Sequence, residues 1–163
     1  MDLDGIVKSP DMRSLERAYQ FFNQVRGRAG RYGMKSKFLV QSSLKDFDIN
    51  LLIDRDKFYK EELNNRRRYK LAPFKRMTGL IVYGKNQKSI INSAARLVSE
   101  LSYINNLQVF GPIPAPIQKI SGMYRWRILL RYNRDFAIQN VLSSIKTKQN
   151  MKIKIDIDPI SFY

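Results

Sequence analysis

The chain has 163 residues, with 30 Lys and Arg against 14 Asp and Glu, so its formal net charge is +16. It has neither cysteine nor histidine, which excludes disulfides, thiolate metal sites and histidine-based nucleophilic catalysis. A charge this large on a chain that is 44% hydrophobic indicates a folded protein with a polyanionic partner. Nucleic acid is the first candidate, ahead of an anionic membrane surface or an rRNA-rich particle.

The apolar runs of the sequence are only a few residues long, far shorter than a membrane span. The start, Met1-Asp2-Leu3-Asp4, is acidic and does not have the pattern of a signal peptide. We therefore expect a cytoplasmic protein with no membrane partner.

The first predicted element is a helix that begins at Ser9-Pro10-Asp11. Serine suits the cap position, proline the first turn, and an acid the positive end of the helix dipole. A short buried strand is predicted at residues 37–41. The helix is supported by apolar side chains at helical spacing: Met12, Leu15, Tyr19 and Phe22.

Between these two elements lies Gln24-Val25-Arg26-Gly27-Arg28-Ala29-Gly30-Arg31, in which an arginine follows each glycine. Hydrolysis of a nucleoside triphosphate builds negative charge on the γ-phosphate, and a permanently charged guanidinium stabilises that charge. Glycine lets the backbone turn tightly and approach a neighbouring domain. The alternative interpretation is an ordinary basic turn after a helix.

This stretch resembles the sixth conserved motif of superfamily-two helicases. The resemblance implies that Gln24 positions water or the γ-phosphate, that Arg28 and Arg31 are arginine fingers, and that Gly27 belongs to the same nucleotide site. The sequence has no Gly-x-x-x-x-Gly-Lys-Ser/Thr loop and no Asp-Glu pair after a hydrophobic strand. ATP and magnesium would therefore be held by another lobe, and we expect no useful ATP hydrolysis by this chain alone.

Residues 46–70 differ in composition, with apolar positions at approximate helical spacing among many charges. They predict a helical linker that ends in a basic run containing Arg66, Arg67 and Arg68. Such a run is either a solvated face or a phosphate contact. Because Pro73 disfavours helical backbone before it, we place the domain boundary after residue 74.

The remaining residues, 75–163, predict strands at 77–83, 107–110, 124–132 and 151–157, with helices at 88–101 and 138–145. Asn133 is the expected cap of the second helix. The order β-α-β-β-α-β is that of a ferredoxin-like α+β domain, a four-stranded, mostly antiparallel sheet with helices on one face. The prolyl segment at residues 111–116 must be extended and is interpreted as a rigid connector.

Strict alternation over residues 124–132 places Arg125, Arg127 and Arg131 on one face of the predicted sheet. Lys152 and Lys154 join them if the last strand has the matching orientation. From residue 76 onward there are thirteen basic and four acidic side chains, a net charge of +9. Arginine on an open sheet pairs with phosphates and stacks on unpaired bases, so we interpret these five cations as DNA-binding. The alternative is an ordinary charged strand face.

Asp156 and Asp158 have the appearance of a paired-carboxylate site. They alternate with isoleucines at the end of a strand, which favours turn-forming or surface acids over metal ligands. No metal site is predicted.

Four blocks carry a second resemblance: residues 9–17 before the arginine motif, 58–66 with 72–74, 111–117, and 122–127 with 156–159. In this order, over essentially the whole chain, they resemble the C-terminal end of the primosomal protein N′ (PriA) family of replication-restart DNA helicases. The implied domains are the end of a second, RecA-like helicase lobe (1–45), a helical linker (46–74) and a DNA-binding domain similar in fold to a small-subunit ribosomal protein (75–163).

The resemblance implies ATP-dependent 3′–5′ unwinding of DNA and primosome assembly during replication restart. It implies as partners branched or single-stranded DNA, the upstream helicase half, single-strand-binding protein and other primosome proteins. The zinc-binding cysteines of the family lie outside this chain, and Met1 falls inside the second lobe. We therefore expect a fragment, the downstream half of a split gene or a remnant.

Two other interpretations stay open. The chain is a stand-alone, non-enzymatic nucleic-acid-binding module with an idle arginine motif, or it is an RNA- or ribosome-associated protein. Restored DNA-stimulated ATPase on mixing with the upstream half would favour the helicase interpretation, whereas a preference for RNA with no effect of ATP would favour the last.

Overall fold

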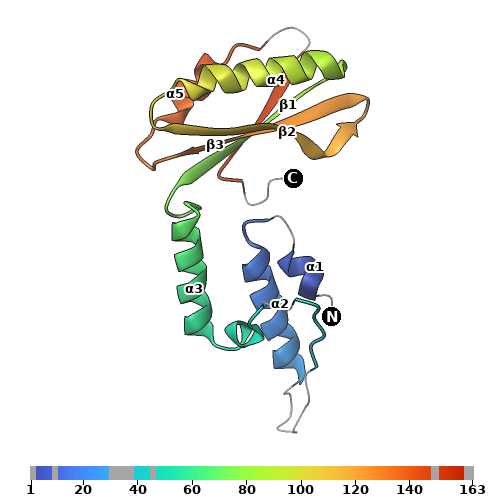
Figure 1. Ribbon diagram of the computed structural model, residues 1–163, viewed down its shortest axis with the longest axis vertical. Coiled ribbons are helices and arrows are strands. Elements are labelled where there is room, and N and C mark those ends of the chain that lie inside the picture. Colours follow the sequence, from blue (N-terminus) through green and yellow to red (C-terminus); the bar gives the residue numbers. More distant parts are fainter. Residues whose placement is uncertain (1–2, 9–10, 30–38, 45–46, 148–150, 160–163) are drawn as a thin grey trace. The chain divides into compact units, whose positions relative to one another are not determined.

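The computed structural model describes residues 3–8, 11–29, 39–44, 47–147 and 151–159 (Figure 1). The chain divides into two compact units, Met1–Tyr69 and Lys70–Tyr163. Helices and an antiparallel sheet together make an α+β structure, which confirms the predicted fold class. No helix among the described residues is long and apolar enough to cross a bilayer.

The described part of the first unit is helical, and its helices share one hydrophobic core. Its elements are α1 (Leu3–Val7), α2 (Ser14–Ala29), the 3-10 helix η2 (Ile49–Leu52) and α3 (Arg55–Arg68). Tyr19 of α2 stacks on Phe58 of α3, with ring centroids 4.2 Å apart and planes 13° apart. Asp54 caps α3 by accepting a hydrogen bond from the amide of Lys57 at 3.0 Å. The helix predicted in the linker thus packs on α2, the helix that contains the first residues of the arginine motif.

Two sequence predictions in this unit are wrong. Helix α2 begins at Ser14 rather than Ser9, because the carboxylate of Asp11 accepts from the amide of Arg13 at 2.9 Å before the helix starts. Ser9 and Pro10 themselves lie outside the described residues. The strand predicted at 37–41 does not form at residues 39–41, where Leu39 is 87% exposed, and residues 37–38 are not described. A strand needs a neighbour for its backbone groups, and the described part of this unit offers none.

The second unit contains the sheet. Its elements are β1 (Arg76–Gly84), α4 (Gln87–Ser102), β2 (Leu107–Ile120), β3 (Met123–Tyr132), α5 (Ile138–Ser144) and β4 (Lys152–Ile157). The strand order is β2-β3-β1-β4, and every neighbouring pair is antiparallel. Strands β1 and β2 both run antiparallel to β3, so the α4 crossover joins two parallel strands with β3 between them. The predicted β-α-β-β-α-β arrangement is confirmed.

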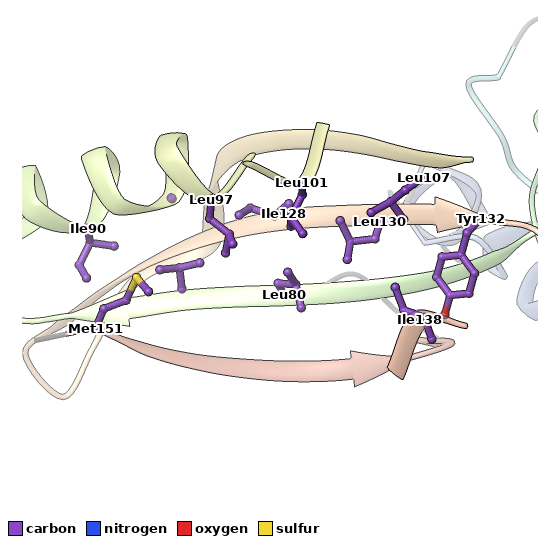
Figure 2. Close-up of a cluster of buried hydrophobic side chains, with 12 residues drawn as sticks. Leu80, Ile90, Leu97, Leu101, Leu107, Ile128, Leu130, Tyr132, Ile138 and Met151 are labelled. Atoms are coloured by element: carbon purple, nitrogen blue, oxygen red, sulfur yellow. The ribbon is translucent and has the colours of Figure 1, made fainter. Parts of the chain in front are cut away.

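The core of this unit lies between the sheet and helix α4, with α5 on the same side (Figure 1). Figure 2 shows Leu97 and Leu101 of α4 reaching toward Ile128 and Leu130 of β3. Fully burying a side chain of this size stabilises the fold by about 1.5–3 kcal/mol. The remaining buried members of the cluster are Leu80, Val82, Ile90, Ala94, Leu107, Tyr132, Ile138 and Met151.

Two local predictions in the second unit need correction. Asn133 does not cap α5, whose N-cap residue Ala137 makes no side-chain cap bond. The side-chain oxygen of Asn133 instead accepts a hydrogen bond from the Lys75 ammonium. The prolyl segment is extended as predicted, but it is part of the long strand β2 rather than a connector. Ser121 and Gly122, both with positive φ, form the two-residue turn from β2 to β3.

Candidate functional site

The sheet face opposite the helices carries the predicted cluster of cations, which we call the basic face. Ile81 of β1 lies between Arg127 of β3 and Lys154 of β4 in the strand register, and Tyr83 lies in the same way between Arg125 and Lys152. Neighbouring strands are about 4.8 Å apart, so cations on β3 and β4 flank β1 at a separation of about 10 Å. The side chains of Lys152 and Lys154 therefore lie on the same face of the sheet as the arginines of β3. The members are Arg125, Arg127, Arg131, Lys152 and Lys154.

Strand β2 adds polar and apolar side chains to the basic face that sequence reasoning missed. The guanidinium carbon of Arg131 lies 4.7 Å from the ring centroid of Phe110. Its Nε donates a hydrogen bond to the Oε1 atom of Gln108 at 2.9 Å. Phe110 is 42% exposed, and Ile113 is 51% exposed beside Arg127 in the register. The only signal in the sequence was the Gly-Pro pair between Phe110 and Ile113, which marks an irregular strand.

The end of the described chain covers one edge of the basic face. A Cβ atom added at Gly79 would lie 3.8 Å from the Cγ atom of Pro159. The amide of Asp158 donates to the carbonyl of Met77 at 2.8 Å, and its carboxylate accepts from Nε of Arg76 at 3.0 Å. The Arg76 guanidinium lowers the pKa of Asp158 below its ordinary value. Asp158 thus closes the end of the β1–β4 pair, a structural role.

Asp156, the other acid of the possible carboxylate pair, is exposed on the edge strand β4. Among the residues that the structure describes, no group of three or more His, Cys, Asp or Glu side chains could hold a metal ion.

The arginine motif lies at the C-terminal end of α2. Gln24 and Arg28 are exposed, and their spacing of four residues places them on one side of the helix. Gly27 is inside the helix, so the tight turn expected there does not occur. A Cβ atom added at Gly27 would meet nothing within 4 Å, which leaves this surface open to approach. Arg31 lies outside the described residues.

The three arginines at the end of α3 differ in exposure and in partners. Arg66 is 12% exposed in its side chain and forms ion pairs with Glu16 at 2.8 Å and Glu62 at 2.6 Å. Arg67 and Arg68 are exposed. The structure thus gives Arg66 a place in the first unit, between α2 and α3, whereas the other two arginines face solvent.

Comparison with known proteins covers both units. Residues 67–160 match the family model described as the primosomal protein N C-terminal domain. The chain is 34% identical to the replication restart protein PriA of Rickettsia typhi, over the whole of this chain and 26% of that protein. It is 28% identical to the PriA protein of Haemophilus influenzae, over 98% of this chain and 23% of that protein.

A third relative, the replication restart protein PriA of Helicobacter pylori strain J99, is 29% identical over the whole of this chain and 26% of its own length. The chain therefore spans about a quarter of the length of the curated relatives that it matches. A family match over more than half of the chain, together with relatives that extend over α2, identifies the family. The chain belongs to the PriA family, and its residues 67–160 are the primosomal protein N C-terminal domain.

Proposed function

We propose that this chain is the C-terminal part of a replication-restart DNA helicase, in which α2 completes an ATP site and the basic face binds DNA. The observation that carries the proposal is the match over the whole chain to proteins named replication restart protein PriA. Recruitment of single-strand-binding protein and other primosome proteins belongs to the same proposal, on the family resemblance.

In the proposed ATP site, another helicase lobe holds the nucleotide and its magnesium ion. Arg28 approaches the γ-phosphate together with Arg31, and Gln24 orients the attacking water. Supporting this role, Gln24 and Arg28 are exposed on one side of α2, and the surface at Gly27 is open. A guanidinium at the transferred phosphoryl group typically raises kcat by about 10³–10⁵-fold.

In the proposed DNA site, the phosphate backbone follows the cations of β3 and β4. Arg127 and Lys154 flank Ile81 across the sheet, so a positive charge lies on each side of this apolar residue. Phosphate contacts of this kind position DNA without reading its sequence. Single-stranded or branched DNA is the proposed substrate, and Arg67 and Arg68 are candidate further contacts.

The test is to mix the chain with the upstream portion of a PriA protein and to measure DNA-stimulated ATPase and DNA affinity separately. We expect Arg28→Ala to abolish the restored ATPase, because the charge at the γ-phosphate is removed, and to leave DNA affinity within about twofold of the unmodified chain. Arg26→Ala is the matched control, since Arg26 lies in the same turn and donates to the carbonyl of Ile53 at 3.4 Å. Equal loss of ATPase and DNA binding in Arg28→Ala would contradict the assignment.

The alternative function is a non-enzymatic nucleic-acid-binding module. It is favoured by one observation, that the second unit has its own hydrophobic core and carries the basic face without help from the arginine motif. In the same experiment this alternative predicts DNA binding with no recovery of ATPase on mixing.

A further inference from the structure

Strand β2 contains an irregularity that changes which side chains reach the basic face. Phe110 pairs with Leu129, and Ile113 pairs with Arg127, so three steps along β2 correspond to two steps along β3. In a regular strand, residues three apart point to opposite faces. Phe110 lies on the basic face through its regular pairing with Leu129, and the extra residue forms a β-bulge that brings Ile113 to the same face.

Gly111 makes this bulge possible. Its φ of +109° lies in a region that residues with a side chain rarely adopt. A Cβ atom at this position would lie 2.7 Å from the carbonyl oxygen of Arg127. The close approach of β2 to β3 at the bulge therefore requires glycine.

The basic face exposes an aromatic ring beside a positioned guanidinium. Gln108 accepts from Nε of Arg131, and the Arg131 guanidinium lies against the Phe110 ring. Phe110 and Ile113 remain 42% and 51% exposed, next to each other on the same face. A regular strand would have turned Ile113 toward the core face, so its exposure beside Phe110 indicates a contact surface.

The charge around this surface indicates its partner. Of the four basic side chains in residues 107–132, Arg125, Arg127 and Arg131 lie on this face, and these residues contain no acid. The partner must therefore be anionic, and it must also offer a flat apolar surface to the ring. Unpaired bases of single-stranded nucleic acid have both properties, whereas a duplex presents phosphates outside and keeps its bases stacked.

We propose that Phe110, with Arg131 against its ring and Ile113 at its side, is a stacking platform for an unpaired base of single-stranded DNA. This inference rests on the proposed DNA binding of the basic face and assigns that face a base contact. It makes the basic face selective for single strands, because only an unpaired base reaches the ring.

The test uses the full chain and two fluorescently labelled probes of equal length, an oligo-dT strand and a blunt duplex, with affinity measured by anisotropy at one salt concentration. We expect Phe110→Ala to weaken oligo-dT binding by about tenfold or more and to change duplex binding by less than about twofold. Phe110→Trp should keep oligo-dT affinity, since an indole also stacks. Tyr103→Ala is the matched control, because Tyr103 is 86% exposed at the end of α4, away from the sheet face.

A second variant, Lys152→Gln with Lys154→Gln, distinguishes failure of the stacking platform from failure of the proposed DNA binding by the basic face. If it weakens binding of both probes while Phe110→Ala weakens neither, the basic face binds DNA and the stacking platform is wrong. If neither variant weakens binding of either probe, the proposed DNA binding of the face fails, and the platform fails with it. Circular dichroism checks that each variant is folded.

Discussion

At the scale of single residues, Arg66 shows how position in the fold decides what a cation does. The sequence places it in a basic run with Arg67 and Arg68, yet its guanidinium is held between Glu16 of α2 and Glu62 one turn earlier on α3. Because Glu62 is 7% exposed, its carboxylate is largely shielded from water and needs a partner within the protein. Arg66 therefore ties two helices together rather than facing a phosphate in solvent.

We predict that Arg66→Ala destabilises the first unit by about 3 kcal/mol, because it leaves the Glu62 carboxylate buried without its ion pair. DNA affinity should fall by no more than the loss of any one positive charge from the chain would cause. Hydrogen exchange measured by mass spectrometry would locate the loss of protection in α2 and α3. Lys60→Ala, which removes an exposed cation from the same helix, is the control and should leave exchange unchanged. Normal exchange with weakened DNA binding in Arg66→Ala would instead identify Arg66 as a phosphate contact.

At the scale of elements, β2 shows how one glycine controls a strand. Alternation predicts the face of each side chain in β3 and β4 because both strands are regular, and the register confirms it. In β2 the extra residue at Gly111 shifts the alternation, so Ile113 reaches the opposite face from that of a regular strand. Helix α4 needed no such correction, since its apolar stripe and its Asn86 cap, which accepts from the amide of Ser89 at 2.9 Å, are both local.

We predict that Gly111→Ala destabilises the second unit by about 1–3 kcal/mol, because the positive φ is strained and the new Cβ meets the Arg127 carbonyl. Thermal unfolding measures the effect. Gly122→Ala is the matched control, since Gly122 also has a positive φ, of 77°, but a Cβ there meets nothing within 4 Å. Its cost should be the smaller of the two, and equal costs would show that the close approach to β3 contributes nothing.

At the scale of the whole molecule, the net charge of +16 makes any DNA binding sensitive to salt. What matters for a particular surface is which of these cations bind phosphates, because each such cation releases counterions when the complex forms. Lys152 and Lys154 are both exposed on the basic face. They therefore report directly on whether phosphates bind to that face.

We predict that Lys152→Gln with Lys154→Gln weakens oligo-dT binding and makes the slope of log affinity against log salt less negative by about 1.4, or about 0.7 for each lysine that binds a phosphate. Binding measured over a series of salt concentrations gives this slope. Lys88→Gln with Lys146→Gln removes the same charge from exposed positions outside the sheet and is the control. Identical slopes for the two double variants would mean that the attraction is diffuse and has no preference for the basic face.

The sequence alone was sufficient for features that depend on residues close together along the chain. The order of strands and helices in the second unit, the apolar stripe of α4 and the alternation of β3 follow from local spacing, since side-chain direction repeats with the backbone period. The basic character of the β3 face was predictable for the same reason. Likewise, the resemblance to the PriA family rested on ordered blocks of sequence, and the family match confirms it.

Only the tertiary structure decided the features that depend on which distant segments meet. The pairing of β1 with both β3 and β4 brings Lys154 alongside Arg127, and no pattern within β4 contains that information. The ion pair of Arg66 with Glu16 joins residues fifty positions apart in the sequence. The absence of a strand at residues 39–41 and the face that Ile113 takes also depend on distant segments. A strand forms only beside a partner, and a bulge is defined only by the strand that it faces.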